Sequence, residues 1–321
     1  MNEAELKQTL SKEKNFVSAV VYLRPGRENA EGALGFFGKL AAELEAHFAQ
    51  YEIVAVDDAA PAGVVAALRS WAADCPKPLT ILHMGLHQGL EAGMNAGLDA
   101  AIGDYVYEFD STEMPYDPAL IFRAYETAQK GNDIVSVCPT RTRGSSVLFY
   151  KIFNANSHGA GRLRTDAFRL VSRRAINRVH ASSPHLPYRK AAYAASGLAM
   201  ADLEFDGRLT DRAAGRFRLA VDSLALYTDA GYRLSAGVAV AMMLVALAEL
   251  AYTLLVFATG HPIQGWTTTM FVLTLGFAGV FAVLAIVVKY LSLLVDLVFK
   301  RQKYLIEGIE KIQNKPACCG P

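Results

Sequence analysis

The stretch LEAGMNAGLDAAIGDYVYEFD, Leu90 to Asp110, decides the fold of this 321-residue chain. Leu90 to Ala101 has a helical composition, although its glycines weaken the prediction. Tyr105 to Phe109 is a short run of β-type residues, and Asp110 ends it. A helix that leads directly into a strand is typical of a βαβ unit, so the stretch predicts an α/β domain.

The same alternation extends in both directions from this stretch. Further strands are predicted at 16–23, 52–56, 79–84 and 133–138, and further helices at 32–49, 62–73 and 118–130. Strands separated by helices of this length predict right-handed crossovers and a mostly parallel sheet.

Three acids lie at predicted carboxyl ends of strands, where ligands bind in such sheets: Asp57, Asp58 and Asp110. One carboxylate can accept hydrogen bonds from a base or a ribose. Another can coordinate Mg²⁺ or Mn²⁺, which offsets the charge of a diphosphate. Taken singly, Asp57 and Asp58 can instead cap the next helix, and Asp110 can simply end a strand. Together the three favour a binding site.

The loop after Asp110 is unusual for a metal–diphosphate site. Thr112 stands where a second carboxylate would be expected, and the next acid is Glu113. We therefore predict metal binding by Asp110 with Glu113, whose longer side chain can replace the missing group. Asp117 precedes a proline and a helical pattern, so it is better interpreted as a helix cap.

Composition indicates a membrane protein. The formal net charge of +1 gives no field that would attract nucleic acid, whereas 52% of the residues are hydrophobic and the mean hydropathy is +0.20. The excess is concentrated in Ser235–Thr259 and Thr267–Val288, each long enough to span a bilayer. Two buried core helices are the alternative, but both segments are long and apolar on all sides.

The residues flanking these spans predict their orientation. No Lys or Arg lies between the spans, whereas Arg233 precedes the first and Lys289, Lys300 and Arg301 follow the second. By the positive-inside rule both termini and the sheet domain are cytoplasmic, at the inner or plasma membrane of the cell. The polar N-terminus has no apolar signal core.

The segment before the first span carries cations suited to a lipid phosphate. Residues 208–230 are predicted to form an amphipathic helix at the interface, with arginines among its polar positions: Arg212, Arg216 and Arg218. Residues 187–200 form a second candidate helix. The alternative is simple adhesion to anionic lipid, without substrate specificity.

With these motifs in order, the chain resembles the membrane-anchored family 2 glycosyltransferases that act on polyisoprenyl phosphate, such as bactoprenol glucosyltransferases and dolichol-phosphate mannose synthases. The resemblance covers about Phe16 to Glu307. It rests on EIVAVDDAAP for the family's VDD-G-S strand, on the block His87 to Asp110, and on FRLVSRRAI and RAAGRFRL. It implies a GT-A-type fold and inverting transfer from a nucleotide sugar to the lipid phosphate. It also implies a homo-oligomer.

The resemblance also assigns roles to residues in altered motifs. Glu28 is all that remains of the family's P-x-Y-N-E and is expected to bind the donor with Asp57, Asp58 and Asp110. Asp166 stands in the acceptor segment and is expected to be catalytic together with Asp110. Arg169 is expected to bind the acceptor phosphate, as are the three arginines of the amphipathic helix.

The altered motifs leave two other classes open. One is a catalytically impaired, membrane-anchored binding or partner subunit; the other is a small transporter subunit, which a sheet domain disfavours. The expected organisation is a polar segment 1–15, a glycosyltransferase-like domain 16–186 and juxtamembrane helices 187–233. A transmembrane hairpin 234–290 and a cytoplasmic tail 291–321 follow.

Overall fold

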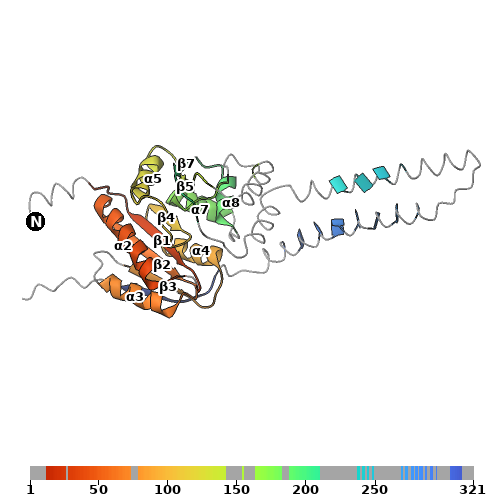
Figure 1. Cartoon of the computed structure of the whole chain (residues 1–321). Coiled ribbons are helices and arrows are strands. Elements are labelled where there is room, and N and C mark those ends of the chain that lie inside the picture. Colours follow the sequence, from red (N-terminus) through yellow and green to blue (C-terminus); the bar gives the residue numbers. More distant parts are fainter. Residues whose placement is uncertain are drawn as a thin grey trace, which may run out of the picture. The chain divides into compact units, whose positions relative to one another are not determined.

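The structure, a computed structural model, describes a sheet domain and isolated positions of a second unit (Figure 1). The described residues are 12–26, 28–73, 79–141, 154, 163–182, 188–209 and 304–312, together with individual positions between 237 and 294. The sheet domain takes in the N-terminal part of the chain and the residues that follow 302.

The sheet has eight strands, in the order β7-β5-β6-β4-β1-β2-β3-β8. The strands are β1 (Val17–Leu23), β2 (Tyr51–Asp57), β3 (Leu79–Met84), β4 (Tyr105–Phe109), β5 (Ile134–Pro139), β6 (Phe168–Ser172), β7 (Met200–Phe205) and β8 (Ile306–Ile312). Strands β4, β1, β2 and β3 are parallel to one another, whereas β6 is antiparallel to β4 and β5, and β8 is antiparallel to β3. The sheet is therefore mostly parallel, as the sequence predicts.

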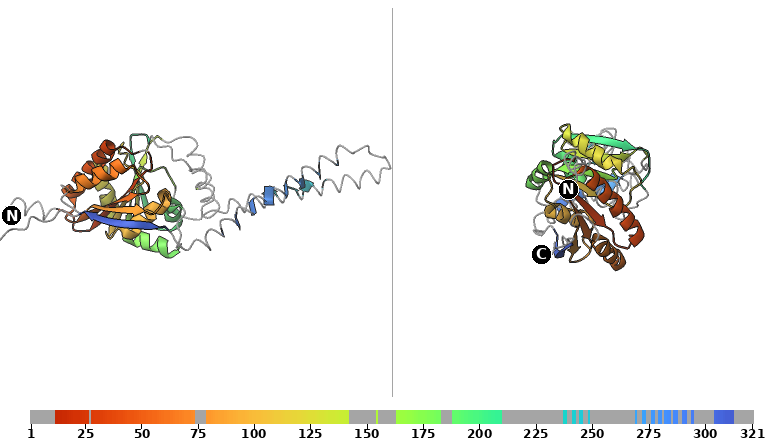
Figure 2. Two further views of the ribbon diagram at one scale, coloured as in Figure 1. Left: turned by 90° about the horizontal axis from the view of Figure 1, so that it is seen from below. Right: turned by 90° about the vertical axis from the view of Figure 1, so that its left-hand side faces the viewer.

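Helices cover both faces of this sheet (Figure 2). They are α2 (Ala30–His47), α3 (Ala62–Ala73), α4 (Leu90–Ala100), α5 (Ala119–Gln129), α7 (Arg173–Ser182) and α8 (Arg189–Ala195). All seven residues of β1 are buried, as expected of a central parallel strand covered on both faces. Alternate residues of β1 face opposite sides, so Val17, Ala19 and Val21 join the core under α2, α3 and α5.

On the other face, α4 lies unusually close to the sheet because two of its residues are glycines. A Cβ atom at Gly97 would lie 2.4 Å from Cγ1 of Val20 and 2.8 Å from Cγ2 of Val56. A Cβ at Gly93 would lie 3.0 Å from the ring of Tyr22. The glycines that weaken the helix in the sequence are thus the residues that let its backbone pack on β1 and β2.

The sheet domain extends further along the chain than predicted. The boundary at 186 is wrong, because α8 is packed in the domain and β7 pairs in parallel with β5. Residues 187–200 are therefore not an interfacial helix: Ala191, Ala192 and Ala194 are buried. The segment 304–312 is likewise not only a tail, since β8 pairs with β3.

The second unit contains both predicted spans, of which the structure describes only individual positions. Its described positions are helical, and a Cβ at Gly279 would lie 2.6 Å from Cγ of Met242, so the two segments are in contact there. Among the positions that the structure describes, no helix is both long enough and apolar enough to cross a membrane. The spans remain a prediction.

A turn after β2 holds Ala59 at a φ of 64°, in the left-handed region that favours glycine. We expect Ala59→Gly to raise the free energy of unfolding by about 0.5–1 kcal/mol, because relief of the strain outweighs the added chain entropy. Urea denaturation measures this change. Ala60→Gly is the control and should lower stability; an Ala59→Gly protein no more stable than the wild type would contradict the prediction.

Candidate active site

Asp110 directly follows β4, at the carboxyl edge of the sheet, where a ligand is expected. Its two carboxylate oxygens accept hydrogen bonds from two arginines: Oδ1 from Arg189 Nη2 at 2.8 Å and Oδ2 from Arg169 Nη2 at 3.2 Å. Burial alone would raise the pKa of Asp110, but the charges of Arg169, Arg189 and Lys190 outweigh it and hold the pKa well below its usual value. The carboxylate is therefore ionised, and its side chain stays 21% exposed.

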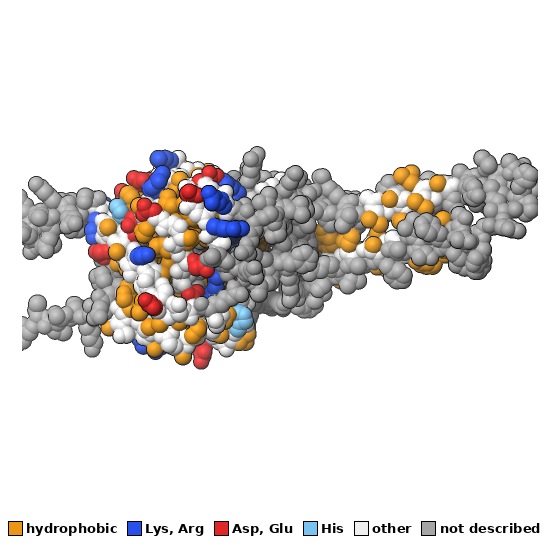
Figure 3. All heavy atoms as spheres, viewed as in Figure 1, with side chains coloured by type: hydrophobic (Ala, Val, Ile, Leu, Met, Phe, Trp, Pro, Cys, Tyr) orange, Lys and Arg blue, Asp and Glu red, His pale blue; other side chains and the backbone are white. Residues whose placement is uncertain are grey.

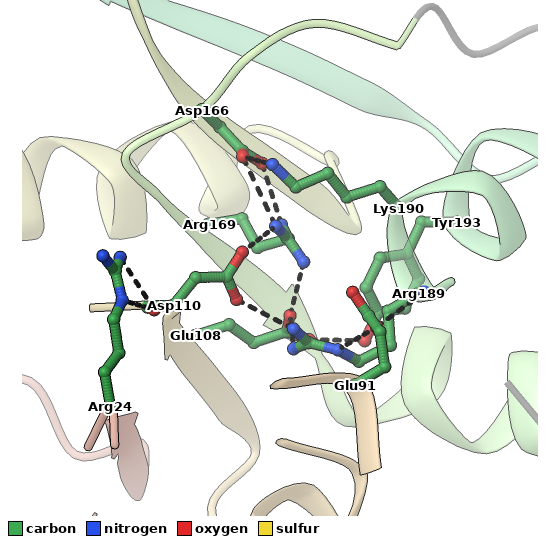
Figure 4. Close-up of polar contacts among 9 residues, drawn as sticks. All are labelled: Arg24, Glu91, Glu108, Asp110, Asp166, Arg169, Arg189, Lys190 and Tyr193. Carbon is green, nitrogen blue, oxygen red and sulfur yellow. Dashed lines mark hydrogen bonds and ion pairs between the residues drawn. The ribbon is translucent and has the colours of Figure 1, made fainter. Parts of the chain in front are cut away.

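Both arginines are also bonded to Glu108. The sequence did not predict this residue as part of the site. The register of β4 and β6 places Glu108 directly opposite Arg169, whose Nη1 lies 2.7 Å from Glu108 Oε2 (Figure 4). Arg189 Nη1 lies 2.6 Å from the same oxygen, and the Tyr193 hydroxyl donates to the other one, at 2.5 Å. Glu108 is fully buried, so these donors offset the cost of burying its charge.

Asp166, the predicted acceptor-side acid, joins the same network. Its Oδ2 accepts from Arg169 Nε at 2.9 Å, and its Oδ1 is bonded to Lys190 Nζ. Burial would raise the pKa of Asp166, but Arg169 and Lys190 lower it below its usual value. The structure therefore brings the two predicted catalytic acids, Asp110 and Asp166, together around one guanidinium group.

The acids and cations of this network do not balance in number. Arg189 also pairs with Glu91, Nε to Oε2 at 2.9 Å, so the network has four carboxylates and three cations and a net charge of −1. We call this set the charge network: Glu91, Glu108, Asp110, Asp166, Arg169, Arg189, Lys190 and Tyr193. A buried network of this kind is stable only while each charge keeps its partners.

The carboxylate of Asp58 is bonded to groups within the protein. It is fully buried, and it accepts hydrogen bonds from the Tyr22 hydroxyl at 2.7 Å and from the amides of Gln88 and Gly89 at 2.8 Å each. His87 Nδ1 lies 2.9 Å from it. With these partners Asp58 fixes the loop before α4, and its donor-binding role stays a prediction.

Asp57 caps a turn, and its side chain stays partly exposed. Its Oδ1 accepts from the Ala60 amide at 2.9 Å, which caps the turn as the structural interpretation predicts. Its Oδ2 lies 2.8 Å from His83 Nδ1, and His83 also approaches Glu310 of β8 at 3.4 Å. The side chain of Asp57 is 16% exposed, so it remains a donor-side candidate.

In the loop after Asp110, Thr112 is hydrogen-bonded to Glu28. The Thr112 hydroxyl donates to Glu28 Oε2, whereas the Glu113 amide donates to Ser111 Oγ at 3.4 Å. Glu28, which follows the first strand, thus places a carboxylate beside Thr112, where the loop itself lacks an acid. Asp117 accepts from the Ala119 amide at 3.0 Å, which confirms the prediction of a cap.

Divalent metal binding fits this arrangement only in part. Within the described residues, no group of three or more His, Cys, Asp or Glu side chains is placed to hold a metal ion. Mg²⁺ and Mn²⁺ at nucleotide sites commonly use one or two carboxylates together with substrate phosphates. The ionised, partly exposed Asp110 suits that mode, so the residues present fit a cation held jointly with a diphosphate.

The predicted acceptor residue Arg169 is not open to a phosphate. Only 2% of its side chain is exposed, and it is bonded to Glu108, Asp110 and Asp166. It is a counter-ion of the buried acids instead. The other acceptor candidates, Arg212, Arg216 and Arg218, lie outside the described residues.

The sequence analysis missed Glu108, and it did not recognise Arg189, Lys190 and Tyr193 as part of the site. One feature of the sequence points to them. Glu108 interrupts an otherwise apolar strand, and a buried acid in a central strand requires a cationic partner. The partners themselves are 61 and 81 residues away, so only the fold identifies them.

A comparison with known protein families matches the part of the chain that contains these residues. The family described as Glycosyl transferase family 2 matches residues 39–196, a range that contains the whole charge network. No curated protein matches the chain.

Several solved structures are similar to the chain. A mannosyltransferase from Pyrobaculum calidifontis, in complex with GDP-mannose and Mn²⁺, is 16% identical; the alignment covers 93% of this chain and 94% of that one, with a TM-score of 0.49. Glucosyl-3-phosphoglycerate synthase from Mycobacterium tuberculosis, in complex with UDP, is 11% identical over 70% and 82% of the two chains, with a TM-score of 0.49. Mannosyl-3-phosphoglycerate synthase from Rubrobacter xylanophilus is 16% identical over 69% and 73%, with a TM-score of 0.45.

The family match and the fold point to the same class of protein. The mostly parallel α/β sheet with flanking helices agrees with the GT-A-like fold that the resemblance implies. The motif acids Asp57 and Asp110 lie at its carboxyl edge, within the matched residues. Residues 39–196 therefore match the glycosyl transferase family 2 model, and this match supports an enzyme that transfers a sugar from a nucleotide sugar.

Proposed function

We propose that the protein transfers a sugar from a nucleotide sugar to a polyisoprenyl phosphate at the cytoplasmic face of the cell membrane. The observation that carries the proposal is the ionised Asp110 at the carboxyl edge of the sheet, inside the family 2 domain. The lipid acceptor is supported by the two long apolar segments that follow the domain.

Exposed apolar positions in the second unit also support the membrane part of the proposal. Seven described residues recur at intervals of three or four, which places them on one side of a helix, and all are exposed: Leu273, Phe277, Val280, Leu284, Val287, Leu291 and Leu294. Figure 3 shows hydrophobic side chains on the surface of the described part of this unit. Large apolar side chains exposed in such a row require a cover, and lipid hydrocarbon is a suitable cover for a segment that has no charged residue from Thr267 to Val288.

The proposed reaction does not require a strong general base from the protein. A lipid phosphate is already ionised near neutral pH, so its oxygen can attack the anomeric carbon directly. The new carbon–oxygen bond forms as the bond to the diphosphate breaks, the nucleoside diphosphate leaves, and the anomeric centre inverts. Asp166, which is ionised and held by Arg169 and Lys190, is therefore not needed as a strong base.

Mg²⁺ or Mn²⁺ is the cofactor that we propose. When bound, it would offset the charge that builds up on the leaving diphosphate. Asp110 would hold it together with the diphosphate. Glu113, the second predicted ligand, lies three residues beyond Asp110, and the carboxylate of Glu28 accepts a hydrogen bond from the Thr112 hydroxyl.

The second candidate is a catalytically impaired, membrane-anchored binding or partner subunit. One observation favours it: both oxygens of Asp110 are already paired with arginines, and Thr112 replaces the second acid. Such a protein would bind a nucleotide sugar without turning it over.

Transfer of radiolabelled sugar separates these functions. Membranes that contain the full chain are supplied with labelled UDP-glucose or GDP-mannose, with undecaprenyl or dolichyl phosphate, and with Mn²⁺. We expect label in the extracted lipid, and none when EDTA replaces the metal. Label only on a soluble acceptor such as 3-phosphoglycerate would contradict the lipid acceptor, and nucleotide binding without transfer would favour the impaired subunit.

A further inference from the structure

The C-terminal strand β8 brings an acid close to Asp57. The register of β2 and β3 places His83 directly opposite Asp57, and the register of β3 and β8 places His83 opposite Gly308. Glu310 stands two positions after Gly308 in β8. Because residues two positions apart in a strand face the same side, Asp57, His83 and Glu310 lie on one face of the sheet. His83 and Glu310 are 227 residues apart in the chain.

The His83 ring lies between the two carboxylates. Its Nδ1 is 2.8 Å from Asp57 Oδ2, and its Nε2 is 3.4 Å from Glu310 Oε2. An ionised carboxylate only accepts hydrogen bonds, so at the shorter contact His83 donates its Nδ1–H to Asp57. Contacts at both ring nitrogens, to acids on different strands, fix the orientation of the ring.

Arg69 of α3 fixes Glu310 in turn. Its Nε and Nη2 donate to Oε1 and Oε2 of Glu310, at 2.7 Å each. A guanidinium that bonds both oxygens sets the plane of a carboxylate as well as its position. The hydrogen bonds from Arg69 also hold the pKa of Glu310 below its usual value, so Glu310 is ionised at neutral pH. A continuous chain of contacts therefore runs from α3 through β8 and β3 to Asp57.

Asp57 keeps the capacity to bind a ligand. A carboxylate has about four acceptor sites, two on each oxygen. The Ala60 amide bonds Oδ1 and His83 bonds Oδ2, and the side chain is 16% exposed at the carboxyl end of β2. A carboxylate fixed on both oxygens already has one orientation, so less conformational freedom is lost when a ligand binds to it.

We propose that His83, held by Glu310 of β8, is a positioning residue that orients the Asp57 carboxylate toward the base or ribose of the donor. This inference rests on the proposed function for the identity of the donor as a nucleotide sugar, and on the predicted contact of Asp57 with it. It makes the C-terminal strand a part of the donor site, although the family match ends at residue 196.

Calorimetry on the full chain in detergent with Mn²⁺ tests the role of His83. UDP and GDP are titrated, and inorganic pyrophosphate is the ligand that lacks a nucleoside. His83→Leu and His83→Asn form a matched pair, because the two side chains have nearly the same shape and only asparagine can donate to Asp57. We expect His83→Leu to weaken nucleotide binding by about two- to tenfold, the loss of one ordinary hydrogen bond. His83→Asn should recover most of the affinity, and pyrophosphate should bind all these proteins equally.

A second pair of variants tests the contribution of β8. Glu310→Ala removes the acid that holds His83, and Glu307→Ala removes an exposed acid of the same strand. We expect a smaller loss of nucleotide affinity for Glu310→Ala, again without loss for pyrophosphate, and no change for Glu307→Ala. Because these changes lie on an edge strand, they keep the test decisive even where His83→Leu lowers the melting temperature.

The outcomes separate this inference from the proposed function. Equal nucleotide affinities for His83→Leu and His83→Asn, or for Glu310→Ala and Glu307→Ala, would overturn the inference and leave the proposed function standing. A loss of pyrophosphate affinity as large as the loss for UDP and GDP would also overturn it, because the change would not be confined to the nucleoside. Absence of any UDP or GDP binding by the wild type would overturn both proposals.

Discussion

Replacing Arg189 by methionine should destabilise the sheet domain by about 3–5 kcal/mol, the cost of leaving a buried ion pair without one partner. Arg189 is fully buried and bonds Glu91, Glu108 and Asp110. Its removal takes the charge network from a net charge of −1 to −2 in a site with little water. Methionine has a similar length and keeps the packing, so the loss reports the charge.

Urea denaturation followed by tryptophan fluorescence measures this effect. Trp71 packs against Phe37 in the core, and Trp266, the second tryptophan, is changed to Phe so that Trp71 is the only reporter. Arg174→Met is the control: Arg174 pairs with Asp133, but its side chain is 72% exposed, so the urea midpoint should hardly move. An equal midpoint for both variants would show that the charge network does not hold the domain together.

Asp110→Asn should have the opposite profile, with folding retained and sugar transfer lost. The change leaves three carboxylates and three cations in the charge network, so the buried charges balance. The amide loses the negative charge that would hold a metal with the diphosphate. We expect kcat/KM to fall by about a hundredfold or more, the equivalent of several kcal/mol of electrostatic stabilisation.

The transfer assay in membranes measures this loss, and the urea midpoint measures folding. Asp117→Asn is the matched control, because Asp117 is an exposed acid in the following loop and asparagine can still accept from Ala119. It should transfer sugar at the wild-type rate. An Asp110→Asn protein that is as active as Asp117→Asn would remove Asp110 from the active site.

The dependence of stability on pH gives Asp110→Asn a second readout. The pKa values of Asp110 and Asp166 are lowered in the folded protein from an ordinary value of 3.8. Their ionised forms therefore contribute stability that is fully present above about pH 4 and is lost as the pH falls through the lowered pKa values. The urea midpoint of Asp110→Asn should fall less steeply below pH 4 than that of the wild type.

Much of the fold was predictable because its pattern is local. The strands 79–84 and 105–109 and the helix 62–73 were predicted with the bounds that the structure shows. Apolar runs of strand length and punctuating turns need no distant partner to be recognised. The strands β6, β7 and β8 were missed. Strands β6 and β8 pair antiparallel with their neighbours, and β8 follows a long intervening segment, whereas β7 pairs in parallel with β5 after two helices that were not both predicted.

The candidate site was predictable only as far as chain position fixes it. The order of strands and helices placed Asp57 and Asp110 at the ligand-binding edge, because the carboxyl ends of parallel strands share one edge. It also placed Asp58 there, yet only the fold shows that Asp58 turns inward to Tyr22 and the loop before α4.

The sequence by itself determined the α/β class, the sheet edge that carries the acids and the two apolar segments, since each follows from periodicity and local composition. Tertiary structure alone decided what those acids do. Arg169 was expected to hold a substrate phosphate, but β6 runs antiparallel to β4 and sets it opposite Glu108. Arg189 was expected at a membrane interface, but α8 packs in the domain and buries it beside Asp110. A buried charge must find its partner across the fold, and those partners lie far apart in the chain.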